Sequence, residues 1–166
     1  MTDYTLYYWQ IPFRGQFIRS VLAHVRASWI ACDRLRLLQL IDNVLENSRR
    51  YAETPGEVSI RIFKSGKSAV LTIEDTGPAP SSEQMQRLFE RFYRAEASRS
   101  RQHGGSGLGL PICRAIAEAH GGDIEATKSF LGGLGITITL PLQHRPTLET
   151  GNIDEERTDA ERAATA

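Results

Sequence analysis

Residues 33–51 read DRLRLLQLIDNVLENSRRY, a stretch that predicts one helix with two chemically different faces. At helical spacing an apolar stripe falls on one side, where it is expected to be buried in a core: Leu37, Leu38, Ile41, Val44, Leu45 and Ser48. The almost opposite side carries four polar side chains: Asn43, Glu46, Asn47 and Arg50. Polar helix faces usually contact water, but asparagine is a weak helix former. Two asparagines one turn apart therefore indicate a role other than helix stability.

The composition is that of one ordinary domain with a real core. The 20 Lys and Arg residues balance the 20 Asp and Glu residues, so no overall field favours nucleic acid, and no nucleic-acid partner is expected. Cys32 and Cys113 lack metal-site spacing, and one pair in a chain of this size favours a reducing compartment. No apolar run spans a bilayer and the start has no signal-peptide layout, so a soluble, cytoplasmic chain is expected.

The segments on either side of this helix divide the chain into three parts. Residues 1–32 are expected to form an arm, whose aromatic-rich start at 1–13 fits a short strand or a packing arm. Apolar residues at i, i+4 and i+8 then predict an amphipathic helix over Gln16–Ala27. Residues 33–144 are expected to form one domain. Residues 145–166 are polar and acidic, which predicts a disordered tail.

The middle part begins with a helix and a hairpin. Asp33 is a candidate N-cap for the two-faced helix, and Pro55–Gly56 mark its end. Apolar residues alternate over 58–62 and again over 69–73, with a turn between them, which predicts a β-hairpin. The second strand of this hairpin runs into a tight Gly-Pro loop.

Two further helices and two strands are predicted after the hairpin. Ser81 or Ser82 can cap a short helix that reaches Phe89, and Pro111 fits the first turn of another helix. The stripe expected to be buried in this last helix is Ile112, Ala115, Ile116 and Ala119. The two remaining strands are expected near residues 124–127 and 136–140.

A glycine-rich run leads into the last helix: Gly104, Gly105, Gly107 and Gly109. Glycines let backbone N–H groups approach a phosphate closely, and a helix N-terminus adds partial positive charge. The run is not a P-loop, because no Gly-Lys-Ser/Thr follows it. It does not fit the dinucleotide fingerprint either, because its spacing differs and a polar loop precedes it. Alone, such a run often only ends an element.

A nucleotide site of this kind needs a metal ligand and a base-reading group from elsewhere in the chain. Asn47 offers a neutral carbonyl oxygen, which suits Mg²⁺ when phosphates supply the negative charge. Asp75 follows a predicted strand and can accept a hydrogen bond from the exocyclic amine of adenine. Taken alone, Asp75 also fits a turn-forming residue.

Taken together, these stretches resemble the ATP-binding catalytic domain of sensor histidine kinases, within the wider group of gyrase, Hsp90 and MutL. Four motifs carry the resemblance, in the family's order and spacing: NVLENSRRY (43–51, N box), EDTGPAP (74–80, G1 box), LFERFYR (88–94, F box) and GGSGLGLPICRAIAEAHGG (104–122, G2 box). The sequence around these motifs is most similar to that of BaeS-type kinases. The resemblance implies a two-layer α/β sandwich, the Bergerat fold, with a mixed sheet and helices on one face.

The resemblance also implies roles for single residues. By position, Asn47 would hold Mg²⁺, and Asn43 would support the phosphates or the waters of the metal. Arg50 would reach phosphate, so that Asn43 and Arg50 are the candidate catalytic residues. Tyr51 would pack near the adenine or ribose, and Asp75 would read the adenine amine.

The other implied residues surround a lid that closes over ATP. Gly77 would keep space for the adenine ring, and Phe89 and Phe92 would anchor the base of the lid. The phosphates would be wrapped by the glycine-rich run: Gly105, Gly107, Leu108 and Gly109.

The sequence departs from the family pattern in four places. No segment matches a phosphoacceptor box, since His24 has no following acidic residue. The family usually has a further strand before the N box, where this chain must use Trp29–Cys32 or the aromatic arm, or lack it. Ala79 replaces a glycine, a mild change. Leu134 replaces a Gly-Thr hydroxyl near the adenine, a loss of about 0.5–1.5 kcal/mol.

Three functions fit these observations. The first is a kinase domain that phosphorylates a histidine on a separate or missing dimerisation domain and, through it, serves a response regulator. Residues 1–32 would then be a remnant of the link to that domain, and the parent would be membrane-anchored with this domain in the cytoplasm. The second is a standalone serine kinase of the anti-sigma type, and the third is a non-catalytic ATP-binding regulatory module.

The residue one turn before the metal ligand separates the first two functions. ATP-hydrolysing relatives and anti-sigma kinases usually carry a glutamate there as a base. This chain has Asn43 at that place, and Glu46 is offset from Asn47 by about 100° around the helix. The sequence therefore favours the histidine kinase, whose acceptor is already nucleophilic.

Overall fold

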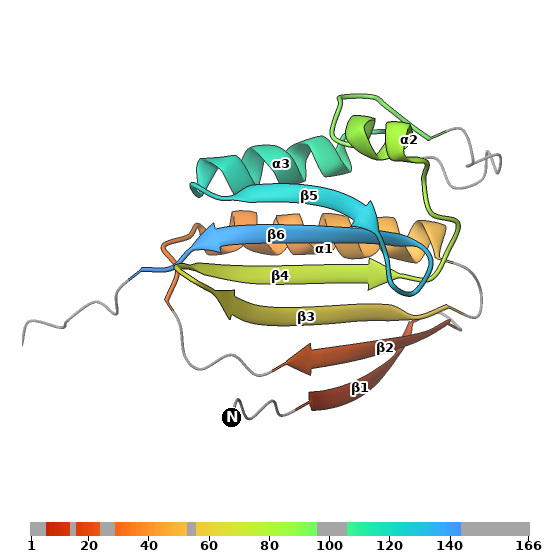
Figure 1. Cartoon of the computed structure of the whole chain (residues 1–166), viewed down its shortest axis with the longest axis horizontal. Coiled ribbons are helices and arrows are strands. Elements are labelled where there is room, and N and C mark those ends of the chain that lie inside the picture. Colours follow the sequence, from red (N-terminus) through yellow and green to blue (C-terminus); the bar gives the residue numbers. More distant parts are fainter. Residues whose placement is uncertain (1–5, 14–15, 24–28, 53–55, 96–105, 144–166) are drawn as a thin grey trace, which may run out of the picture.

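The computed structural model describes residues 6–13, 16–23, 29–52, 56–95 and 106–143, with side chains from residue 29 onward. The elements follow one another as shown in Figure 1: β1 (Leu6–Phe13), β2 (Gln16–Ala23), α1 (Arg34–Tyr51), β3 (Val58–Ser65), β4 (Ser68–Asp75), α2 (Ser82–Arg87), α3 (Gly109–Ala119), β5 (Asp123–Lys128) and β6 (Leu134–Pro141). Several residues named in the sequence predictions lie outside the described residues: His24, Pro55, Gly104, Gly105 and the tail 145–166.

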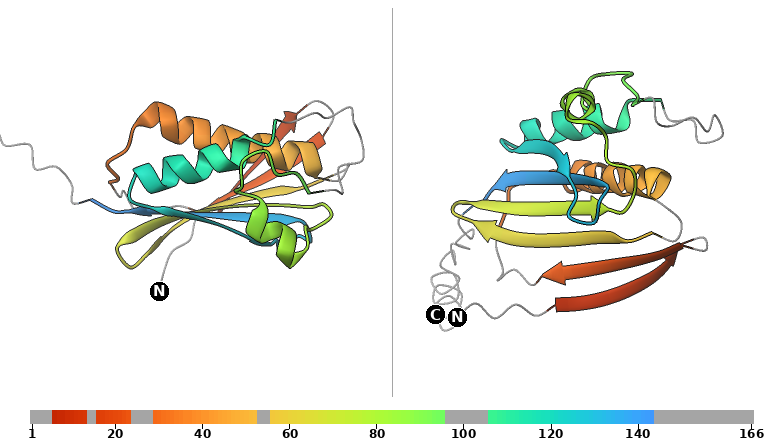
Figure 2. Two further views of the ribbon diagram at one scale, coloured as in Figure 1. Left: turned by 90° about the horizontal axis from the view of Figure 1, so that it is seen from above. Right: turned by 45° about the vertical axis from the view of Figure 1, so that its right-hand side comes forward.

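Four strands form one sheet in the spatial order β3-β4-β6-β5, and every neighbouring pair is antiparallel. Helices α1 and α3 cover one face of this sheet (Figure 2). The predicted two-layer α/β sandwich is thereby confirmed. The prediction of a mixed sheet is wrong for these four strands, because β3–β4 and β5–β6 are hairpins and a short turn joins only antiparallel neighbours.

The N-terminal arm is a hairpin rather than a strand followed by a helix. β1 and β2 pair antiparallel, with Phe13 opposite Gln16. The predicted helix over Gln16–Ala27 is therefore wrong over the part that the structure describes. Only two residues separate the strands, and β2 contains residues that favour strands, so local pairing overrides the helical spacing: Phe17, Ile18 and Val21.

The N-terminal arm places a strand beside the edge of the sheet, where the family pattern has a further strand. β2 lies against β3 and runs in the same direction as it, beside the outer strand of the four-stranded sheet (Figure 1). It belongs to its own two-stranded sheet and does not join the antiparallel ladder. Trp29 lies in the segment that precedes α1, and its carbonyl accepts a hydrogen bond from the Gln143 N–H at 2.7 Å.

The start of α1 is fixed by its cap and by α3. The Asp33 side chain accepts hydrogen bonds from the backbone N–H groups of Leu35 and Arg36, which confirms the predicted N-cap. The Asp33 N–H donates to Nε2 of His120 at 2.9 Å, and His120 Nδ1 lies 2.7 Å from the Ile116 carbonyl. Nε2 accepts and Nδ1 donates, so this arrangement requires the neutral imidazole.

The buried stripe of α1 differs from the predicted stripe at two positions, because Leu40 is part of it and Leu38 is not. Leu40, Val44 and Ser48 follow one another at intervals of one helical turn. Leu40 and Val44 are fully buried, and Ser48 is 3% exposed. Leu38 is 44% exposed, so its assignment to the core is wrong. The helical angle gives the reason: Leu40 lies about 40° from Val44 around the helix, whereas Leu38 lies about 120° away.

The buried stripe of α3 differs from the predicted stripe at most positions. Ile116 is buried as expected, but Ala115, Ala119 and Ile112 are exposed. The core is instead contacted by Leu110, Cys113 and Ala117, at i, i+3 and i+7. Cys113 lies where α3 meets α1, with its Sγ 3.5 Å from the Leu40 carbonyl, and a small thiol fits such a close approach.

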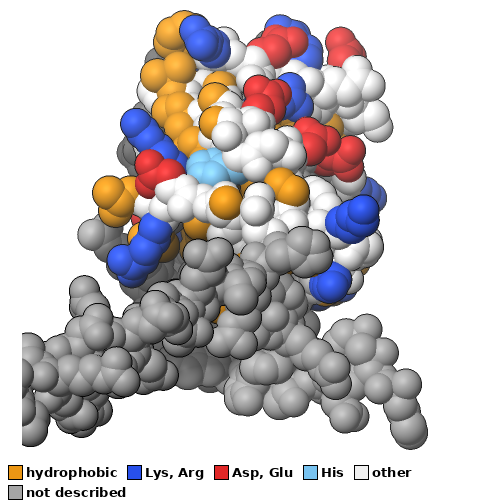
Figure 3. Space-filling model, turned by 90° about the vertical axis from the view of Figure 1, so that its left-hand side faces the viewer, with side chains coloured by type: hydrophobic (Ala, Val, Ile, Leu, Met, Phe, Trp, Pro, Cys, Tyr) orange, Lys and Arg blue, Asp and Glu red, His pale blue; other side chains and the backbone are white. Residues whose placement is uncertain are grey.

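The surface carries no region of one charge sign on the face that Figure 3 shows, where blue and red side chains alternate. This agrees with the net charge of zero. Cys32 is exposed and Cys113 is buried, and both are free thiols. Over the described residues, no helix is long and apolar enough to cross a membrane.

The two leucines of α1 provide a direct test of this core. Leu40→Ala is expected to lower the free energy of unfolding by about 2–5 kcal/mol, because it leaves a cavity under the helix. The matched control Leu38→Ala should change it by less than about 1 kcal/mol. Urea unfolding followed by circular dichroism measures both, and similar losses for the two variants would contradict the assigned stripe.

Candidate functional site

A cavity of about 490 Å³ opens at the end of the sheet where β4 finishes and α3 begins. Its walls are the polar face of α1, the loop after β4, the start of β6 and the first turn of α3, on the right-hand side of Figure 1. Small-molecule sites usually have volumes of about 300–1,000 Å³. The cavity is therefore large enough for a nucleotide.

Most of the residues singled out from the sequence meet in this cavity. The lining includes residues from all four motifs, among them these predicted ligands: Asn43, Asn47, Arg50, Tyr51, Asp75, Gly107, Leu108 and Gly109. Gly77 and Phe92 do not line it. Motifs more than 60 positions apart in sequence thus form one site, although the role of each residue in it stays a prediction.

Asp75 is the most deeply buried charged side chain of the cavity, at 2% exposure. Its Oδ1 accepts the Leu134 N–H at 2.8 Å, while Oδ2 has no hydrogen-bond partner among the described residues. Burial raises the pKa of Asp75, and the Leu134 N–H acts against this rise. The Ser48 hydroxyl lies near enough to the carboxylate to act in the same direction, although it makes no hydrogen bond to Oδ2. A ligand that donates a hydrogen bond to Oδ2 would therefore pair the remaining acceptor of this buried carboxylate.

The turn between β5 and β6 is built closely around Asp75. The Gly133 N–H donates to the Asp75 carbonyl at 3.0 Å, one residue before Leu134 donates to the carboxylate. A Cβ at Gly133 would lie 2.3 Å from Asp75 Oδ1 and 2.5 Å from the Asp75 carbonyl oxygen. Only glycine therefore fits at this position, and the turn and the carboxylate hold each other in place.

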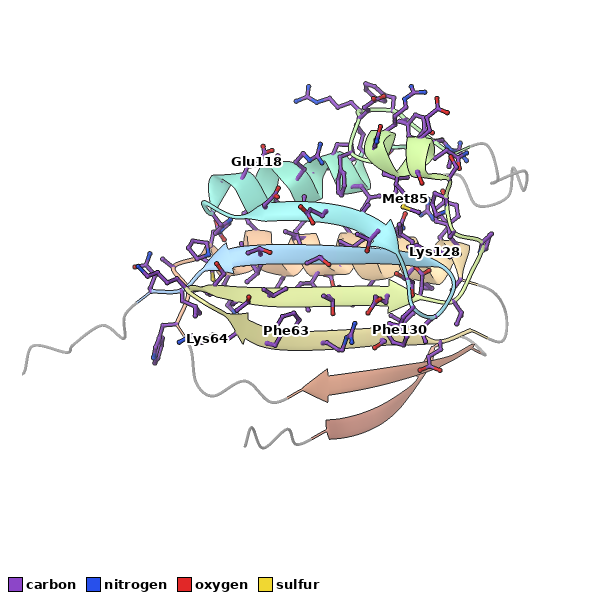
Figure 4. All side chains as sticks on the ribbon, in the orientation of Figure 1. Phe63, Lys64, Met85, Glu118, Lys128 and Phe130 are labelled. Atoms are coloured by element: carbon purple, nitrogen blue, oxygen red, sulfur yellow. The ribbon has the colours of Figure 1, made fainter. Side chains whose placement is uncertain are left out.

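Glu74 anchors the same turn from the helix-free face of the sheet. This side chain is buried, forms an ion pair with Arg61 on β3, and accepts the Phe130 N–H at 3.3 Å. The Arg61 guanidinium also lies over the Phe130 ring, 5.0 Å from its centre. Phe130 appears near the end of β4 in Figure 4. Two consecutive carboxylates thus fix the turn from opposite faces.

The N-terminus of α3 faces the cavity without a side-chain cap. Leu108 occupies the cap position and makes no side-chain hydrogen bond, whereas Asp33 and Ser81 cap α1 and α2. Gly107, Leu108 and Gly109 line the cavity at this point. Uncapped first-turn N–H groups and the helix dipole together favour an anion.

Comparison with known proteins identifies the family. Residues 32–144 match the family described as "Histidine kinase-, DNA gyrase B-, and HSP90-like ATPase". The chain belongs to this ATPase family. It is 52% identical over 111 residues to Signal transduction histidine-protein kinase BaeS of Escherichia coli strain K12. The aligned residues are 67% of this chain and 24% of that protein. The resemblance to sensor histidine kinases is confirmed.

Two further relatives agree with this assignment. Sensor histidine kinase CpxA of Escherichia coli strain K12 is 39% identical over 105 residues, which are 63% of this chain and 22% of that protein. The solved structure of Mycobacterial sensor histidine kinase MprB has a TM-score of 0.69 and 29% identity, covering 77% of this chain and 86% of that one. The chain spans about a quarter of the length of the two curated relatives. Membership of an ATPase family implies that it binds ATP.

Against this family pattern, Phe92 and Phe89 have different positions. Phe89 is buried, and the Arg114 guanidinium lies over its ring, 4.1 Å from the centre. Phe92 is 72% exposed and has a positive φ of 63°. Its N–H donates to the Gly107 carbonyl at 3.0 Å, and a Cβ at Gly107 would lie 2.9 Å from Phe92. The backbone of Phe92, rather than its ring, thus holds the end of the glycine-rich run.

Gly77 lies behind the cavity wall. A Cβ at this position would lie 2.7 Å from the Tyr51 carbonyl oxygen, so glycine lets the loop after β4 pack onto the end of α1. The structure therefore explains Gly77 by close backbone packing. Space for an adenine ring at Gly77 stays a prediction.

Several lining residues were missed at the level of sequence. Glu46 lines the cavity, in agreement with its place on the polar face of α1, although no binding role was assigned to it. Arg94, Ala95 and Ser106 also line it, next to the undescribed residues 96–105. Arg94 ends the F box and Ser106 lies in the G2 box, but no role was assigned to either, and Ala95 lies outside the motifs. Leu134 was noted only for a lost hydroxyl, yet its backbone N–H holds Asp75.

Substitution at Gly133 tests how closely the turn holds Asp75. Gly133→Ala is expected to lower the free energy of unfolding by roughly 1–3 kcal/mol, because its Cβ overlaps the carboxylate. In the control Gly109→Ala the new Cβ meets nothing within 4 Å, and the free energy of unfolding should not fall. Urea unfolding gives both values. A Gly133→Ala protein as stable as the parent would contradict the close fit.

Proposed function

We propose that this chain is the ATP-binding catalytic domain of a two-component sensor histidine kinase. It transfers the γ-phosphate of ATP to a histidine on a separate dimerisation domain. The observation that carries the proposal is the buried, unpartnered Oδ2 of Asp75 in a cavity lined by all four family motifs. Adenine carries an exocyclic amine, which is the donor that this oxygen lacks. An adenine ring between Tyr51 and Leu134 would be partly enclosed by the apolar atoms of these two side chains.

The phosphates would then extend from the base towards α1 and the start of α3. Arg50 on α1 supplies a guanidinium in the cavity wall, and the uncapped N-terminus of α3 supplies backbone N–H groups. Gly107 and Gly109 have no side chains to obstruct a close approach of the polyphosphate. Transfer in such a site depends mainly on positioning the γ-phosphate and balancing its charge.

Asn47 and Asn43 fit a magnesium ion that is bound together with ATP. Both side chains line the cavity one turn apart on α1 and offer neutral amide oxygens, a hard donor type that Mg²⁺ accepts. No cluster of three His, Cys, Asp or Glu side chains occurs over the described residues, so the phosphates would supply most of the negative charge. Asn47 would hold the ion and Asn43 its waters. The ion would neutralise the phosphates during transfer.

The acceptor is inferred from the weakness of the nearby base. A serine hydroxyl needs a general base near neutral pH, and Glu46 is the carboxylate beside Asn47 on α1. Hydrogen bonding to Arg49 lowers the pKa of Glu46 to about 2, so it is a poor base at pH 7. A neutral histidine needs no such help, which favours a histidine acceptor over the anti-sigma type of serine kinase.

The partners follow from this function. We infer that the chain acts on the phosphoacceptor histidine of a dimerisation domain, which then passes the phosphate to a response regulator. Its parent kinase would be anchored in the membrane with this domain in the cytoplasm. A regulatory module that binds ATP without catalysis is the competing function.

Transfer and binding are tested on the same preparation. The chain is incubated with labelled Mg·ATP and an isolated four-helix phosphoacceptor domain, and a non-hydrolysable ATP analogue is titrated calorimetrically. We expect acid-labile label on the acceptor. We also expect roughly ten- to hundredfold weaker analogue binding in Asp75→Asn, because a charged hydrogen bond is lost, and loss of transfer in Asn47→Ala.

The outcomes separate the candidate functions. Analogue binding without any label would favour the regulatory module, and acid-stable label on a serine-containing partner would favour the serine kinase. No binding to the folded chain would contradict every function that uses ATP. Leu38→Ala serves as the control variant, because Leu38 lies outside the cavity lining and should leave binding unchanged.

A further inference from the structure

Glu46 places a negative charge in a cavity that is expected to hold phosphates. It lines the cavity from the same helix as Arg50, one turn earlier. Unless it is neutralised, a carboxylate close to a polyphosphate opposes its binding by Coulomb repulsion. The contacts of Glu46 show how this charge is balanced by neighbouring arginines.

The two arginines that follow Glu46 contact it unequally. Arg49 forms a fork, with Nε 2.6 Å from Oε2 and Nη2 2.5 Å from Oε1. Arg50 makes one longer contact, from its Nη2 to the same Oε1 at 3.2 Å. A two-bond arginine–carboxylate pair is much stronger than a single shared contact. Arg49 is therefore the firm partner and Arg50 the exchangeable one.

We propose that Glu46 is a positioning residue that holds Arg50 at the cavity wall until a nucleotide polyphosphate takes this arginine over. Arg49 keeps Glu46 neutralised after Arg50 has moved. This inference rests on the proposed ATP-binding function and adds to it a residue that sets the affinity of the site for polyphosphates. Only ligands that carry a polyphosphate take part in this exchange, because a nucleoside has nothing to offer Arg50. Glu46 therefore lowers the affinity of the site for a polyphosphate and leaves its affinity for a nucleoside unchanged.

The energetics of the exchange are modest, as a reversible binding step requires. The Glu46 side chain is 44% exposed and the Arg50 side chain 23% exposed, so water weakens their attraction. Only the longer contact has to break, while the Arg49 fork persists. Without that fork, Glu46 would attract Arg50 more strongly and the polyphosphate would compete less well. A plain helix-stabilising ion pair would instead affect folding and leave ligand preference unchanged.

Affinities for two ligands test the inference in the full chain. The ligands are adenosine and a non-hydrolysable ATP analogue, titrated calorimetrically with Mg²⁺ at fixed salt concentration. Glu46→Gln should raise the affinity for the ATP analogue roughly two- to fivefold, because Arg50 is released. Arg49→Gln should lower it by a similar factor. Adenosine affinity should stay the same in both variants and so reports an intact fold.

Two double variants separate the exchange from a general charge effect. In the Arg50→Ala background, Glu46→Gln should lose most of its effect on the ATP analogue. In the Glu46→Gln background, Arg49→Gln should have no further effect. The inference is overturned if Glu46→Gln weakens analogue binding, if it changes adenosine binding equally, or if its full effect persists without Arg50. If the parent chain binds neither ligand, the proposed function itself fails. This result differs from one in which the parent chain binds both ligands and the variants leave the ratio of the two affinities unchanged.

Discussion

Asp75 is a buried carboxylate at the end of β4, and the turn between β5 and β6 is built around it. Gly133 and Leu134 hold its backbone and one of its oxygens, and Glu74 fixes the same turn from the other face of the sheet. Its second oxygen is left without a donor in the cavity. The fold therefore keeps the second oxygen of this carboxylate available as an acceptor, at a position where a ligand in the cavity can donate to it.

Helix α1 connects this site to the core. Its inner face is fully buried at Leu40 and Val44, and Ser48 extends this stripe to Asp75. Its outer face supplies Asn43 and Asn47 to the cavity. The hydrophobic stripe thus fixes how the helix is rotated, and the rotation places the polar side chains. A core residue and a ligand-binding residue on α1 are constrained by the same packing.

The sequence was sufficient for the motifs, the hairpins and the sandwich, because these depend on local periodicity, turn chemistry and family resemblance. It failed where long-range packing decides. Helical spacing favoured a helix over Gln16–Ala27, but pairing with β1 makes a strand of residues 16–23. Leu38 and Leu40 are chemically identical, so only the rotation of α1 against the sheet separates them. The exposed ring of Phe92 depends on its contact with Gly107, which no periodicity encodes.

The function proposed for Asp75 is that its Oδ2 accepts a hydrogen bond from the amine of a bound adenine. The most direct measurement compares the affinities of the chain for adenosine and inosine, since inosine carries a carbonyl in place of this amine. A carbonyl facing a carboxylate leaves both acceptors unpaired, so inosine should bind at least about tenfold more weakly. The same comparison in Asp75→Asn should show a much smaller difference, because an amide can donate to the carbonyl. Equal affinities of the parent chain for the two nucleosides would contradict this role of Asp75.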